Sequence, residues 1–142
     1  MLENDDDRRS IVLELSEFIN RICADSATVH FHQLPGYLVW FVEVEPARLG
    51  ALPVSLTGEQ FLHLNIGRDA HWELDYTEDH LAFVRTAIES VVFGRGTISF
   101  SNHLTLDDVR VRGRRVNRPA GLPRLGQGLS WFVPRRIQPY RR

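Results

Sequence analysis

The residues best suited to chemistry lie in the stretch HWELDYTEDHLAF, which begins at His71. Its first half alternates polar and apolar residues, a pattern typical of a strand with one buried and one solvated side. The polar side carries an imidazole and two carboxylates, on His71, Glu73 and Asp75. Two further acids, Glu78 and Asp79, follow at the expected start of a helix. Such a set can move a proton in acid–base catalysis, bind a basic protein surface, or simply face water.

Three other histidines could join a metal site. His30 and His32 stand two residues apart and therefore share one side of an expected strand, and His63 has the same alternating placement in the segment 61–66. A catalytic zinc ion takes three protein ligands and keeps one open position. No HExxH motif accompanies these histidines, and the single cysteine, Cys23, excludes a multi-thiolate site. We therefore expect no cofactor, with His30, His32 and His63 as the alternative metal ligands.

The chain lacks the motifs of common catalytic machinery. It has no GxxxxGK[ST] phosphate loop, no GxGxxG and no nucleophile-elbow pattern. A pair of histidines on a sheet face can cleave RNA, but small nucleases usually place a phosphate-binding cation on the same face. The expected strands before Arg110 carry almost no such cation. The sequence therefore favours a protein that is not an enzyme, with a small histidine-dependent hydrolase or nuclease as the alternative.

Charge is unevenly distributed along the 142 residues. All 17 basic residues are arginine, and they nearly balance the 18 acids, for a formal net charge of −1. Residues 1–108 hold 7 of the arginines and every acid, a net of −11, whereas residues 109–142 hold 10 arginines and no acid, a net of +10. A basic end of this kind can grip phosphates or fold back onto an acidic body. Because neither an aromatic platform nor a recognition helix is evident, nucleic acid is not the expected partner, and nucleic-acid binding by this end stays as a further alternative.

The apolar pattern predicts the elements that must position these residues. Spacings of three and four predict one helix over 7–24 and a second that is capped by Thr77 and stopped by Gly94. Alternating or apolar runs predict strands at 28–32, 37–44, 61–66, 71–76, 97–101 and 109–112, and at most a short strand near Val54. Hairpin connections favour an α+β fold, in which a mostly antiparallel sheet carries both helices on one face.

This layered arrangement would collect polar side chains on the sheet face opposite the helices: His30, His32, His63, Asn65, His71, Glu73 and Asp75. The aromatic residues of the strands are expected in the core or, alternatively, as anchors for a partner: Tyr37, Trp40, Trp72 and Tyr76. We expect a single domain over 1–142, with a flexible acidic end at 1–6 and an irregular basic tail at 113–142. Four apolar residues would pack that tail on the body: Trp131, Phe132, Val133 and Ile137.

The sequence indicates a cytoplasmic protein. No apolar run approaches the roughly 20 residues that span a bilayer, so no membrane association is expected. The first residues, MLENDDDRRS, are acidic and lack the apolar region of a secretory signal.

The segment HWELDYTEDHLAFVRTAIESVVFGRG, His71 to Gly96, resembles small bacterial, often actinobacterial, immunity proteins of polymorphic toxin systems. Many of these proteins carry an aromatic and acidic strand, then a helix, then a short apolar-Gly-Arg exit. The resemblance covers 26 of the 142 residues and implies a cytoplasmic, non-catalytic protein that binds one cognate toxin and covers its active site. Toxins that act on nucleic acid or nucleotides have basic clefts, which an acidic edge would suit. The expected partner-binding residues are His71, Glu73, Asp75, Glu78 and Asp79.

Overall fold

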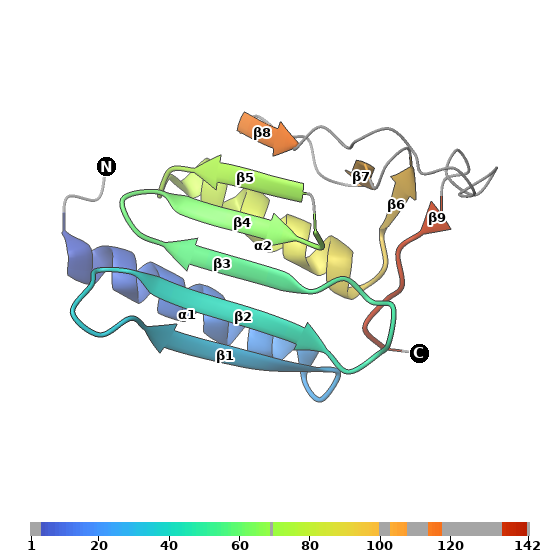
Figure 1. The fold of residues 1–142 in the computed structure, drawn as a ribbon, viewed down its shortest axis with the longest axis horizontal. Helices are drawn as coiled ribbons and strands as arrows, with labels where there is room; N and C mark the ends of the chain where they lie inside the picture. Colours follow the sequence, from blue (N-terminus) through green and yellow to red (C-terminus); the bar gives the residue numbers. More distant parts are fainter. Residues whose placement is uncertain (1–3, 69, 100–102, 108–113, 118–134, 142) are drawn as a thin grey trace.

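A computed structural model of the chain describes residues 4–68, 70–99, 103–107, 114–117 and 135–141 (Figure 1). Within these residues the helices are α1 (Asp5–Cys23) and α2 (Glu78–Val92). The large sheet contains β1 (Ala27–Gln33), β2 (Trp40–Pro46), β3 (Val54–Gly58), β4 (Leu62–Ile66), β5 (Ala70–Leu74) and β8 (Arg114–Asn117). A small sheet contains β6 (Gly96–Ser99), β7 (His103–Leu106) and β9 (Arg135–Arg136). The predicted α+β fold is confirmed.

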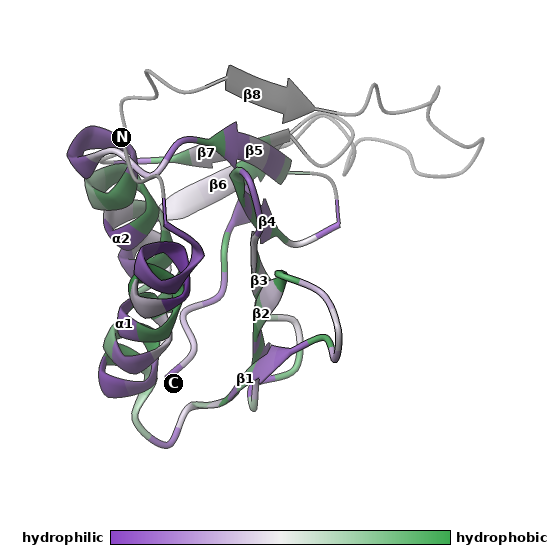
Figure 2. Cartoon of the chain, turned by 90° about the vertical axis from the view of Figure 1, so that its left-hand side faces the viewer, coloured by the Kyte–Doolittle hydropathy of each residue, from purple (hydrophilic) through white to green (hydrophobic). Residues whose placement is uncertain are grey.

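The large sheet is antiparallel throughout, in the order β1-β2-β3-β4-β5-β8. Its first five strands are neighbours in both sequence and space, so each is joined to the next by a short connection. Both helices lie on one side of this sheet, and in the part of the chain described no helix covers the other side (Figure 2). Strand alternation explains the layering, because every second side chain points toward the helices.

The core lies between the helices and the sheet. Leu56, Leu64 and Trp72 are in register across β3, β4 and β5, and each is at most 2% exposed. The ring of Phe83 on α2 packs edge-on against Trp72, with ring centroids 5.8 Å apart. Trp40 is equally buried. Trp72 and Trp40 are therefore core residues rather than partner anchors.

Both helices begin at side-chain caps. Thr77 caps α2 as predicted, since its Oγ1 accepts a hydrogen bond from the His80 backbone N–H at 3.3 Å. Helix α1 begins two residues earlier than expected, because Asn4 Oδ1 accepts from the Asp6 N–H at 3.0 Å and caps it. The acidic residues expected in a flexible end thus belong partly to the first turn of α1, where carboxylates interact favourably with the helix dipole.

Helix α1 approaches the sheet closely at Gly58, in β3. A Cβ atom at Gly58 would overlap the side chain of Val12, which is fully buried in α1. Glycine in a strand often marks such a close approach, because any larger residue would force the two elements apart.

The end of the chain packs on the body, as expected, but it is not wholly irregular. Within 113–142 the described residues include the strands β8 and β9, and Ile137 and Tyr140 are buried. The Tyr140 hydroxyl donates to the Leu52 carbonyl at 2.5 Å, and its N–H donates to the Val92 carbonyl at 2.9 Å. Arg48 Nη1 donates to the Pro139 carbonyl at 3.1 Å. The strand predicted at 109–112 lies outside the described residues, and so do the expected anchors Trp131, Phe132 and Val133. Strand β8 begins at Arg114, two residues after the end of the predicted strand. Of the helices that the structure describes, none has the length and apolar character to cross a membrane.

Candidate functional site

The sheet face opposite the helices collects most of the polar residues that the sequence placed there. The strand register pairs His63 with Glu73 and with Thr57, and it pairs Asn65 with His71. Each of these side chains alternates with buried ones, so all of them lie on the uncovered face. This face carries no arginine on β1–β5, because those strands contain none.

A second part of the uncovered face is acidic. His30 on β1 is paired with Glu43 on β2, and Glu43 and Glu45 are both exposed. Together with Ser55 and neighbouring residues they line a shallow groove of about 350 Å³. The acids of β2 therefore give this part of the uncovered face a negative character.

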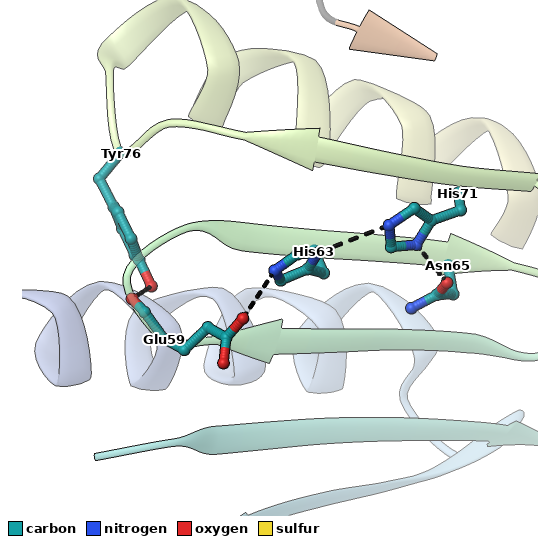
Figure 3. A network of polar contacts seen from close by, with 5 residues as sticks. All are labelled: Glu59, His63, Asn65, His71 and Tyr76. Carbon is teal, nitrogen blue, oxygen red and sulfur yellow. Dashed lines mark hydrogen bonds and ion pairs between the residues drawn. The ribbon is translucent and has the colours of Figure 1, made fainter. Parts of the chain in front are cut away.

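Two histidines meet on this face (Figure 3). His63 Nδ1 lies 3.5 Å from His71 Nε2, and the two rings are stacked with centroids 5.4 Å apart. His63 Nε2 lies 3.0 Å from Glu59 Oε1, and His71 Nδ1 lies 2.6 Å from Asn65 Oδ1. Cross-strand pairing positions this chain of four residues, since His63 and Asn65 come from β4 and His71 from β5.

The hydrogen-bonding capacity of this network allows two arrangements of its protons. If Asn65 presents its oxygen, His71 Nδ1 must donate, and the contact between the rings then needs a proton on either His63 Nδ1 or His71 Nε2. The contact with the Glu59 carboxylate needs a further proton on His63 Nε2. If the Asn65 amide is turned by 180°, each histidine needs only one proton and all three contacts remain satisfied. The orientation of the Asn65 amide therefore decides how many ring protons the three contacts need.

The alternative metal site predicted from His30, His32 and His63 does not form. His30 and His32 lie on β1 and His63 on β4, three strand spacings away, which corresponds to about 14 Å. Among the described residues no group of three His, Cys, Asp or Glu side chains is placed to hold a metal ion. Sequence spacing could not show this, because it does not give the order of the strands.

The five residues expected to bind a partner divide between two neighbouring places. His71 and Glu73 lie on the uncovered face, whereas Asp75, Glu78 and Asp79 lie where β5 turns into α2. The three acids at the turn line a groove of about 740 Å³, which we call the turn-end groove. Its other lining residues come from α1, the β3–β4 turn and the same β5–α2 turn: Arg8, Gln60, Phe61, Tyr76 and Thr77.

Tyr76 forms a fixed wall of the turn-end groove. Its hydroxyl donates to the Glu59 carbonyl at 2.7 Å, and the Arg8 guanidinium lies 5.8 Å from the centre of its ring. Burial raises the pKa of Tyr76 to about 12, so its hydroxyl remains protonated and a donor at neutral pH. Glu59 thus joins the groove to the histidine network, through its carbonyl on one side and its carboxylate on the other (Figure 3).

Exposed apolar side chains gather at the same end of the sheet. In an antiparallel sheet the turns after β1, β3 and β5 lie at one end (Figure 1). The exposed apolar residues of the first two of these turns are Leu34 (42% exposed), Tyr37 (63%), Leu38 (57%) and Phe61 (37%). The exposure of Phe61 and Leu38 was not expected from the sequence, because each stands next to an apolar run and was assigned to a strand. The strand after Phe61 begins one residue later, at Leu62, and the strand after Leu38 begins two residues later, at Trp40.

Comparisons with known proteins did not identify a family for this chain. A scan against protein-family models, a search of curated proteins and a search of solved structures each found no match.

Proposed function

We propose that the chain is a non-catalytic, immunity-type protein that binds a cognate toxin and covers the toxin's active site. The observation that carries the proposal is the end of the sheet formed by the turns after β1, β3 and β5. Phe61 lines the same groove as the acids Asp75, Glu78 and Asp79, and Tyr37 is exposed in another turn at this end of the sheet. Protein interfaces typically combine buried aromatic or aliphatic anchors with a polar rim.

The charge of this surface supports a basic partner. The three acids of the turn-end groove lie at one end of the sheet, and strands β1–β5 contribute Glu43, Glu45 and Glu73 but no arginine to the uncovered face. Complementary charge accelerates association and selects against acidic partners. A toxin that acts on nucleic acid needs a basic cleft, and this surface is suited to fill it.

Co-expression with a neighbouring gene tests the proposal. We expect a protein encoded beside this gene to arrest growth, and the full chain to restore growth and form a complex with it in size-exclusion chromatography. Replacing Glu73 and Asp75 by Gln and Asn should weaken the complex at least tenfold in calorimetry, since each rim charge supports association.

The matched control removes two exposed charges from the outer face of α1, by Glu14→Gln and Glu17→Gln. It should leave the affinity within about twofold of the parent chain. A gene neighbourhood without a growth-arresting protein, or a toxin that this chain neither binds nor neutralises, would refute the proposal.

A second candidate function is a histidine-dependent hydrolase or nuclease. The observation in its favour is the 3.5 Å approach of His63 and His71, which brings together two side chains of the type that serves most often in acid–base catalysis. Under this function the purified chain should cleave RNA, and His63→Ala or His71→Ala should lower the rate by roughly 10²–10⁴-fold. Cleavage that survives both substitutions would come from a contaminant and count against it.

A further inference from the structure

We propose that the turn-end groove binds an arginine side chain of the protein partner, together with an apolar residue next to that arginine. The inference rests on the proposed function and states which chemistry the partner presents at this place. Three properties of the groove carry it: its carboxylates, which form no ion pair with the residues that the structure describes, its aromatic wall and its size.

The carboxylates of the groove are available to a ligand. Asp75, Glu78 and Asp79 are exposed, and no described residue forms an ion pair with any of them. Arg8 is the cation among the described lining residues, and it already lies 3.3 Å from Asp5. The first turn of α2 accounts for the acids at 78 and 79 but not for Asp75, which precedes the helix. Three carboxylates against one guanidinium leave the groove negative and therefore suited to a cation.

The aromatic wall distinguishes arginine from lysine. Phe61 is 37% exposed, and Tyr76 already holds the guanidinium of Arg8 near its ring. A planar guanidinium stacks on an aromatic ring and offers a fork of donors that matches a carboxylate. An ammonium group is more strongly hydrated and binds as a point charge. Phe61 and Asp75 line the same groove, so an arginine that enters it would meet both a ring and a carboxylate.

The groove has room for more than one side chain. Its volume of about 740 Å³ falls within the roughly 300–1,000 Å³ of pockets that enclose ligands of drug size. An arginine with its aliphatic stem and one neighbouring apolar residue would fill such a volume and cover the exposed ring of Phe61.

A titration followed by nuclear magnetic resonance tests this inference on the full chain. The probes are acetyl-Leu-Arg-amide, the lysine analogue, and the citrulline analogue, which has the shape of arginine without its charge. We expect the arginine peptide to shift the amide signals of Phe61, Tyr76 and Thr77, and to bind at least fivefold more tightly than either analogue. Asp75→Asn with Asp79→Asn should weaken its binding at least fivefold, whereas Glu14→Gln with Glu17→Gln should change it less than twofold.

Equal binding of the citrulline or lysine peptide, or signal shifts that map away from the groove, would overturn the inference. The outcome is separable from that of the proposed function. A chain that rescues growth from a toxin but fails this titration would keep the function and lose the arginine site. A chain that binds the peptide but neutralises no neighbouring toxin would do the reverse.

Discussion

At the scale of single residues, Glu59 has the widest consequences. Its backbone carbonyl holds the hydroxyl of Tyr76, and its carboxylate lies beside His63, which in turn contacts His71. A residue in the turn between β3 and β4 therefore connects the wall of the turn-end groove to the polar network on the uncovered face. Any ligand that displaces Tyr76 must also disturb the position of Glu59.

Removing the Tyr76 hydroxyl should have an effect that depends on pH. Tyr76→Phe loses one hydrogen bond, so we expect its free energy of unfolding to fall by about 0.5–1 kcal/mol at pH 8. The folded pKa of Tyr76, about 12, lies above the ordinary value of 10. The stabilisation is therefore complete below pH 10 and is lost as the pH rises toward 12, because the unfolded chain ionises first.

Urea unfolding of the two proteins at pH 8 and pH 11, followed by tryptophan fluorescence, measures this difference. The difference in free energy of unfolding between the parent chain and Tyr76→Phe should be smaller at pH 11 than at pH 8. Tyr37→Phe alters an exposed hydroxyl and should leave stability unchanged at both pH values. A gap that stays constant with pH would show that burial does not perturb Tyr76.

At the scale of elements, the sequence predicted both helices and most strands of the large sheet, because their apolar residues recur with clear periods. Strand β3 was assigned largely to a loop, since VSLTG is short, follows Pro53 and itself ends in a glycine. The sequence predicted that His63 and His71 share one face of the sheet. It could not predict that they are in contact, because the register of the two strands depends on the turn that joins β4 to β5. The turn-end groove was not predictable, since it unites the start of α1 with two turns that are distant from it in sequence.

The contact between α1 and β3 yields a prediction about stability. Gly58→Ala would drive a methyl group into Val12, so we expect it to lower the free energy of unfolding by about 1–3 kcal/mol. Thr57→Ala changes the adjacent residue on the uncovered face and should cost about 0.5 kcal/mol or less. Thermal unfolding of the two variants measures both, and equal melting temperatures would mean that α1 can move away without cost.

At the scale of the whole molecule, some arginines of the basic C-terminal end form ion pairs with acids of the preceding part of the chain. Arg136 lies 3.0 Å from Asp107, and Arg141 lies 3.8 Å from Asp25. These exposed pairs contribute little energy, whereas Ile137 and Tyr140 are buried against the body. Apolar packing, more than charge, therefore holds this end of the chain in place.

Deleting residues 137–142 should destabilise the fold. We expect the free energy of unfolding to fall by roughly 3 kcal/mol or more, because two buried side chains and the hydrogen bond from Tyr140 to Leu52 are lost. Arg141→Gln removes one exposed pair and should cost less than about 0.5 kcal/mol. Chemical denaturation measures both.

A deletion that leaves stability intact, yet abolishes salt-sensitive binding to RNA or DNA, would instead favour a nucleic-acid role for this end.

The meander from β1 to β5 also bears on how the chain reaches its folded state. Each of these strands pairs with the one made just before it, so the sheet closes only short loops, and the entropic cost of each closure is small. Strand β8 must instead return across 39 residues to reach β5. A chain leaving the ribosome can therefore assemble five strands and both helices in the order of synthesis, and β8 docks afterwards onto a sheet that already exists.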